Sequence, residues 1–153
     1  IQIDADGQHD LAAVTDFLDQ AHHNPQALVC GYPIYDQTVP LSRLWGRKLT
    51  NFWVHVNTRS KALRDAMCGF RVYPLAQTLP VLPSVKTRRM DFDPDIVVRL
   101  IWAGVTVINR PVRVTYPKDG ISHFRGFSDN MRISRLHAGH FCTMLLRRMG
   151  LAK

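Results

Sequence analysis

The first 31 residues constrain the fold more than any other part of the chain. An apolar start, Ile1-Gln2-Ile3, leads into the polar hexapeptide DADGQH at residues 4–9. A helical repeat of apolar residues follows over residues 10–22, with Asp10 placed to cap it, and residues 27–31 (ALVCG) form a short apolar run. A strand, a helix and a second strand in this order predict one unit of a parallel sheet. The hexapeptide would then lie at the carboxyl edge of that sheet, where open α/β folds bind ligands.

The rest of the chain continues the alternation of helices and strands. Residues 41–57 place apolar side chains, including Trp45 and Trp53, on one helical face. That face would pack on the core or, alternatively, rest on a membrane or a lipid acceptor. Further signals predict strands at residues 69–73, 105–108 and 112–116, a helix from its cap Asp93 to Gly104, and a helix over residues 128–149. We expect an α/β fold with a mixed, mainly parallel sheet flanked by helices.

The composition indicates a globular domain that attracts anions. The 153 residues are 46% hydrophobic and 21% charged, which suits one domain with a real core. The net charge of +8 attracts phosphate in any form, whether nucleic acid, anionic lipid or nucleotide-sugar. The basic residues form no dense run, and no aromatic RNA-binding signature accompanies them, so nucleic acid is not the expected partner.

Cysteine usage and hydropathy bear on location. The three cysteines, Cys30, Cys68 and Cys142, are far apart and odd in number, which argues against a disulfide framework and favours a reducing compartment. No window approaches the roughly 18 to 20 apolar residues that span a bilayer. We expect a cytoplasmic protein whose membrane contact, where it has any, is peripheral at the inner face of the membrane.

The hexapeptide carries the clearest chemistry. Asp4 and Asp6 provide two carboxylates at alternate positions, and Gln8 adds an amide oxygen. Hard oxygen ligands of this kind suit Mg²⁺ or Mn²⁺, ions that also bind the oxygens of a substrate diphosphate. The pattern therefore predicts a divalent-cation site. The other interpretation is that the aspartates only cap a helix or solvate a turn.

The order of motifs along the chain resembles the family 2 inverting glycosyltransferases, most nearly the polyprenol-phosphate sugar transferases. The similar segments are DADGQH, ALVCG, the aromatic-rich helix, CGFRVY (residues 68–73), residues 90–116 and ISHFR (residues 121–125). The resemblance covers nearly the whole chain and implies the GT-A (nucleotide-diphospho-sugar transferase) fold. It also implies transfer from a nucleotide-sugar to a lipid-linked or other hydroxyl or phosphate acceptor, such as a saccharide, at the cell envelope, with Mg²⁺ or Mn²⁺ as cofactor.

The family's functional residues carry over to positions of this sequence. The metal ligands that the resemblance implies are Asp4, Asp6 and Gln8. It places Arg71 near phosphate or the lipid-side acceptor, the other interpretation being a surface arginine on a strand. Asp95, and after it Asp93, would be the general base, because the step requires a carboxylate within reach of the acceptor hydroxyl proton. An acceptor phosphate would need no base.

Two departures from the family pattern fall among the residues expected to bind phosphate. His123 stands where the family has Lys. The resemblance implies that this segment is a mobile loop near the donor diphosphate, and Arg125 would supply the charge instead. Gly31-Tyr32-Pro33 stands where these transferases often have Gly-Ser-Arg. We expect Arg71, His123 and Arg125 to form the phosphate-binding set.

The acidic motif begins at the fourth residue, so we expect an incomplete GT-A fold that lacks the N-terminal nucleotide-binding half. Residues 1–126 would be the metal- and acceptor-binding portion, and residues 127–153 a C-terminal amphipathic helical segment. Such a portion would have little transferase activity alone and would self-associate through uncovered surfaces. The alternative from another class is a non-catalytic basic module that binds anionic lipid or carbohydrate.

Overall fold

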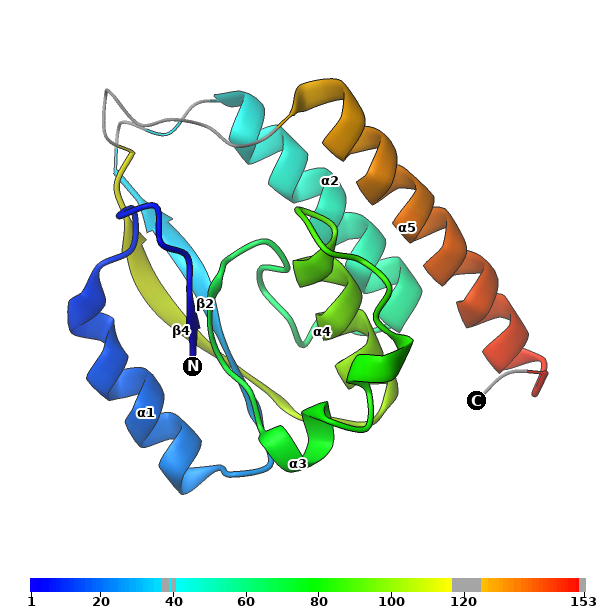
Figure 1. Ribbon diagram of the computed structural model, residues 1–153, viewed down its shortest axis with the longest axis horizontal. Coiled ribbons are helices and arrows are strands. Elements are labelled where there is room, and N and C mark those ends of the chain that lie inside the picture. Colours follow the sequence, from blue (N-terminus) through cyan, green and yellow to red (C-terminus); the bar gives the residue numbers. More distant parts are fainter. Residues whose placement is uncertain (37–38, 40, 117–124, 152–153) are drawn as a thin grey trace.

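A computed structural model describes residues 1–36, 39, 41–116 and 125–151. These residues form one mixed sheet with helices on both of its faces (Figure 1). The strands are β1 (Gln2–Ile3), β2 (Leu28–Tyr35), β3 (Phe70–Val72) and β4 (Val107–Val114). The α-helices are α1 (Val14–His23), α2 (Leu41–Thr58), α3 (Leu75–Thr78), α4 (Phe92–Trp102) and α5 (Gly126–Arg148), with 3₁₀ turns at Leu11–Ala13 and Leu82–Ser84.

The described strands lie in the order β1-β3-β2-β4. β2 and β4 are parallel, in register from Leu28 opposite Val107 to Tyr35 opposite Val114. β3 is antiparallel to both β1 and β2, because the chain returns after α2 and enters the sheet between the two strands of its first unit. The α/β prediction is thus confirmed in its coarse form. The sheet is mixed, as expected: β1, β2 and β4 run in one direction and β3 runs against them, so among the described neighbours only β2 and β4 pair in parallel.

β4 is one continuous strand, whereas the sequence predicts two strands with a break around Pro111. Pro111 lies opposite Tyr32 of β2 inside the ladder. A proline has no N–H to donate, but β4 is at the edge of the sheet, where a missing donor leaves no neighbouring strand unpaired. Edge position therefore explains why the proline does not end the strand.

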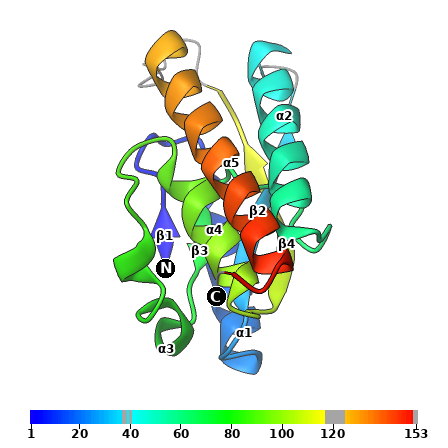
Figure 2. The same cartoon turned by 90° about the vertical axis from the view of Figure 1, so that its right-hand side faces the viewer.

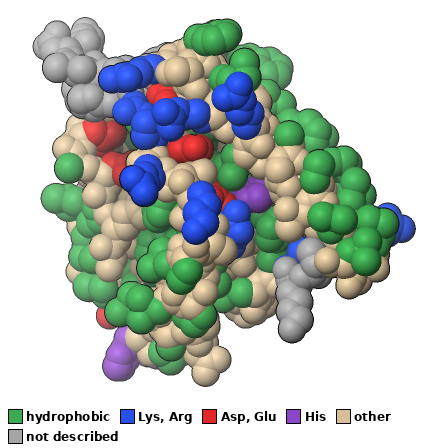
Figure 3. Space-filling view, turned by 45° about the vertical axis from the view of Figure 1, so that its right-hand side comes forward, with side chains coloured by type: hydrophobic (Ala, Val, Ile, Leu, Met, Phe, Trp, Pro, Cys, Tyr) green, Lys and Arg blue, Asp and Glu red, His purple; other side chains and the backbone are tan. Residues whose placement is uncertain are grey.

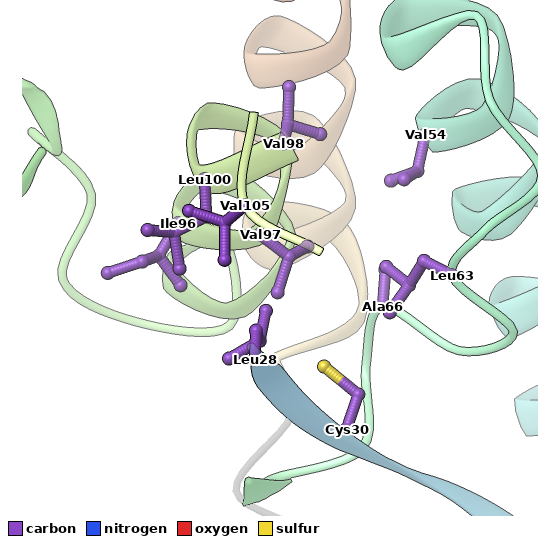
Figure 4. Packing of buried hydrophobic residues seen from close by; sticks show 10 residues of the cluster. All are labelled: Leu28, Cys30, Val54, Leu63, Ala66, Ile96, Val97, Val98, Leu100 and Val105. Carbon is purple, nitrogen blue, oxygen red and sulfur yellow. The ribbon is translucent and has the colours of Figure 1, made fainter. Parts of the chain in front are cut away.

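Alternate residues of β2 divide the core into two clusters, one on each face of the sheet. Leu28 and Cys30 pack with Val54 of α2 and with Val97 and its neighbours on α4 (Figure 4). On the opposite face, Val29 packs with Phe17 of α1 and with residues of β3 and β4. This alternation is the normal consequence of the two-residue repeat of a strand.

α5 lies outside α2 and α4 and runs beside α2 (Figures 1 and 2). The expected helix over residues 128–149 is therefore confirmed, as is the helix over residues 41–57. The apolar face expected on α2 divides into two, because Trp53 packs against His137 and Phe141 of α5 while Trp45 is exposed. No helix in the described ranges combines the length and the hydropathy of a bilayer-spanning segment.

One of the two predicted helix caps is correct. The Asp10 carboxylate accepts a hydrogen bond from the backbone N–H of Ala12 at 3.0 Å, as expected for a cap. Asp93 is not a cap, because α4 already begins at Phe92 and Asp91 occupies the capping position. The Asp93 side chain turns to Arg71 instead, at 2.8 Å.

Candidate functional site

The acidic loop, residues 4–9, is held at both ends by backbone hydrogen bonds. The N–H of Asp4 donates to the carbonyl of Gly69 at 3.1 Å, and the N–H of Thr115 donates to the carbonyl of Gln8 at 3.0 Å. The loop thus connects the end of β1 with the end of β4. It lies at the end of the molecule where β2 and β4 finish, which confirms its expected place at the carboxyl edge (Figure 1).

The carboxylate of Asp4 lies directly against the backbone of Gly69. A Cβ atom on Gly69 would overlap both carboxylate oxygens, so only glycine leaves room for them. Nε2 of His9 is 3.9 Å from Oδ2 of Asp4, whose side chain remains 43% exposed. The His9 imidazole holds the pKa of Asp4 below its usual value, against the effect of partial burial, and the charges of Arg71 and Arg47 act in the same direction as His9. Asp4 is therefore an ionised carboxylate with access to solvent.

In the same loop Asp6 is exposed and Gln8 is half-buried. Oδ1 of Asp6 accepts a hydrogen bond from the backbone N–H of Gln8 at 3.1 Å, which closes a local Asx turn. Across the described ranges, no three His, Cys, Asp or Glu side chains are grouped so that they could hold a metal ion by themselves. The oxygen donors here suit a hard cation, but one that takes further ligands from water or from a substrate.

Arg71 is fully buried beneath the loop and is not the surface arginine that was one interpretation of its strand position. One guanidinium nitrogen donates to Oδ1 of Asp93 at 2.8 Å, and the other donates to the carbonyl of Ala66 at 2.8 Å. Burial opposes the charge, but Asp93 and Tyr73 hold the pKa of Arg71 above its usual value. Gln2 completes the network, since it donates to Asp93 and accepts from the Tyr73 hydroxyl.

The two carboxylates proposed as the base have different surroundings. Asp95 is 1% exposed and accepts hydrogen bonds from Thr87 and Arg99, while Nε2 of His140 lies 2.9 Å from its Oδ1. Burial alone would raise the pKa of Asp95, yet His140 and Arg99 keep it below its usual value. The Asp93 side chain is 20% exposed and joins Arg71 to β1. Asp93 is thus the carboxylate nearer to solvent and to the acidic loop.

The structure describes two of the three predicted phosphate-binding residues, Arg71 and Arg125. His123 lies outside the described residues. Arg125 is exposed at the start of α5, and its backbone N–H donates to Oδ2 of Asp129 at 2.8 Å. That N–H lowers the pKa of the buried Asp129 carboxylate, helped by Arg89 at 3.5 Å. Figure 3 shows Lys and Arg side chains gathered with acidic side chains among them on the upper part of the molecule.

Sequence reasoning missed two residues that act on Asp4. His9 belongs to the hexapeptide, and its place five residues after Asp4 is the signal that could have identified it. Arg47 extends from α2, is paired with Asp65 at 2.6 Å and lowers the pKa of Asp4. No local pattern distinguishes Arg47 from the other basic residues of α2, so only the fold shows its proximity to the site.

Comparison with known protein families, with curated proteins and with solved structures found no match for this chain. A functional assignment therefore rests on the chemistry of the site. The arrangement combines an ionised, accessible carboxylate, a second exposed carboxylate and a buried cation behind them. It can bind a hard divalent cation whose remaining ligands are phosphate oxygens or water.

Proposed function

We propose that the acidic loop binds Mg²⁺ or Mn²⁺ together with the diphosphate of a nucleotide-sugar, and that the chain is part of an inverting glycosyltransferase of the GT-A type. One observation carries the proposal. The ionised Asp4 carboxylate lies against Gly69 at the carboxyl edge of the sheet, with the buried Arg71 cation behind it. The mixed α/β sheet is compatible with that fold class.

The donors of the loop fit such an ion. Mg²⁺ in nucleotide sites usually takes one or two carboxylates and completes its shell with phosphate oxygens and water. The ligands would be Asp4 and Asp6, assisted by the amide oxygen of Gln8. When bound, the ion would neutralise charge on the departing diphosphate. Arg125 would add positive charge at the same end of the molecule.

Of the two proposed base residues, we favour Asp93 over Asp95. A base must come within hydrogen-bond reach of the acceptor hydroxyl, which the buried Asp95 could do only after α5 moved away. Asp93 is partly exposed beside Arg71. In this position Arg71 would be a positioning residue that fixes Asp93 and the start of β3, since its own guanidinium is covered by protein.

A non-catalytic module that binds anionic lipid or carbohydrate is the second candidate. It is favoured by the bonding of the proposed bases, since both carboxylates already accept hydrogen bonds from arginine side chains. For Asp95, His140 and Arg99 keep the pKa below its usual value, which makes this carboxylate a weak base.

Calorimetry of Mn²⁺ binding, with UDP and with GDP, tests the proposal on the full chain. We expect nucleotide binding that requires metal and that Asp4→Asn weakens about tenfold or more. Asp19→Asn, a change at an exposed aspartate of α1, is the matched control and should have no effect. Binding of neither nucleotide would overturn the proposal. That result would favour the non-catalytic module.

A further inference from the structure

A line of exposed apolar side chains runs along the outer face of α2. Its members are Leu41, Trp45, Leu49 and Phe52, spaced four, four and three residues apart. That spacing places them on one face over about 16 Å of helix. Trp45 is 70% exposed and Leu49 is 61% exposed, so this line contributes little to the core.

The apolar line continues onto α5 through aromatic contacts. The Phe52 ring is 5.5 Å from the Trp53 ring, and Trp53 is 6.3 Å from Phe141 of α5. Beyond Phe141, α5 exposes the large apolar side chains of Leu145 and Leu146, and Met149 is exposed directly after the helix. α2 and α5 lie side by side, and Figure 3 shows hydrophobic side chains gathered on the side where α5 runs. We call this surface the α2–α5 face.

The charges on these two helices have one sign. α2 contains no Asp or Glu, and the one acidic residue of α5, Asp129, is buried. Exposed basic residues flank the apolar line on both helices: Lys48, Arg132, Arg135 and Arg148. The Lys48 ammonium lies 5.2 Å from the Trp45 ring centroid. Two copies of such a face would repel each other, so its charge opposes the self-association expected above and favours an anionic partner.

We propose that the α2–α5 face docks the protein on an anionic lipid bilayer. Helices that lie in the membrane interface combine an apolar face containing Trp, Phe and Leu with flanking Lys and Arg, and Trp favours the headgroup level. Both features are present here on two adjacent helices. α2 and α5 also begin at the end of the molecule that carries the acidic loop (Figure 1). Docking does not depend on the metal and nucleotide proposal.

Flotation with vesicles, in a buffer that contains neither metal nor nucleotide, tests whether the protein docks on lipid. The protein is mixed with phosphatidylcholine vesicles that contain about one third phosphatidylglycerol, and in parallel with pure phosphatidylcholine vesicles. We expect binding to the anionic vesicles that falls with added salt, and much weaker binding to the neutral ones. Lys48→Gln should lower the partition constant about fivefold, because one basic charge at the anionic surface is lost. Lys86→Gln, at an exposed lysine before α4, is the control.

A pair of leucine variants locates the binding face. Leu49→Ser removes an apolar side chain from the α2–α5 face and should weaken vesicle binding about fivefold or more. Leu18→Ser makes the same change at a 47% exposed position of α1, on the other side of the sheet, and should not affect binding. The proposal is overturned if the protein fails to bind anionic vesicles, if the two leucine variants bind alike, or if Leu49→Ser instead dissociates a dimer.

Discussion

Nε2 of His140 on α5 lies 2.9 Å from Oδ1 of Asp95 on α4, and both side chains are buried. The same carboxylate accepts a hydrogen bond from Arg99 at 2.6 Å, and the His140 ring packs edge-on against Trp102 at 5.1 Å. This buried polar contact joins the C-terminal helix to the helix that covers the sheet. Loss of this contact would weaken the packing of α5 and would leave the Asp95 carboxylate without its histidine partner.

Replacement of His140 by alanine should destabilise the protein. The change removes a hydrogen-bond partner from the buried Asp95 and leaves a cavity beside Trp102, so we expect the free energy of unfolding to fall by about 2 to 4 kcal/mol. Urea unfolding measures the difference. His22→Ala on α1, at an exposed position, should change it by less than about 0.5 kcal/mol. Equal effects of the two variants would mean that the α4–α5 contact does not form in solution.

Two arginine–aspartate pairs of different burial give a second prediction. Asp93→Asn leaves the buried Arg71 charge without a counter-charge and should lower the free energy of unfolding by about 3 kcal/mol or more. Asp16→Asn breaks the pair with Arg110 at the surface, where solvent screens both charges, and should cost about 1 kcal/mol or less. Thermal or urea unfolding of both variants checks the contrast, which a similar cost for the two would contradict.

Local sequence signals predicted the parts of the site that lie close together in the chain. The strand, the acidic loop and the helix capped by Asp10 follow one another within 23 residues, and the structure places them as expected. α2 was also predictable, because its apolar spacing persists over several turns. Elements of this kind depend on neighbouring residues, which a sequence pattern records directly.

Long-range partners could not be predicted in the same way. The capping pattern around Asp93 fits a helix start equally well whether its carboxylate caps the helix or pairs with Arg71, 22 residues earlier. His140 and Asp95 are 45 residues apart, and nothing in either segment signals the contact. The insertion of β3 between β1 and β2 is likewise a property of the whole sheet. These choices are made by tertiary packing and not by local propensity.

The buried His137 predicts how stability depends on pH. Burial lowers its pKa to about 4, and His140 acts in the same direction. In the unfolded chain a histidine titrates near 6.5, so between these two values the unfolded state binds more protons and stability falls as the pH falls. This contribution is complete above pH 6.5 and is lost progressively down to about pH 4. At pH 5 the free energy of unfolding should be about 2 kcal/mol lower than at pH 7.5 on account of His137.

Urea unfolding across this pH range measures that contribution. His137→Gln keeps an amide near Asn57 but cannot take up a proton, so its loss of stability between pH 7.5 and pH 5 should be smaller by about 2 kcal/mol. His22→Gln, at an exposed histidine, should retain the full pH dependence. An unchanged slope in the His137 variant would show that this side chain takes up its proton equally in the folded and unfolded states.

The contact between Gly69 and Asp4 links the sheet to the proposed metal site, and Gly69→Ala tests it. The added methyl group would overlap the Asp4 carboxylate and turn it away from its place beside His9, so Mn²⁺ binding should weaken about tenfold or more while the fold persists. Gly139→Ala is the matched control, since a Cβ there meets no atom within 4 Å. It lies inside α5 and should stabilise the protein by about 1 kcal/mol without changing Mn²⁺ binding. Calorimetry of Mn²⁺ with both variants tests whether Asp4 is a metal ligand. Undiminished binding by Gly69→Ala would show that Asp4 does not bind the ion, even if the chain binds it elsewhere.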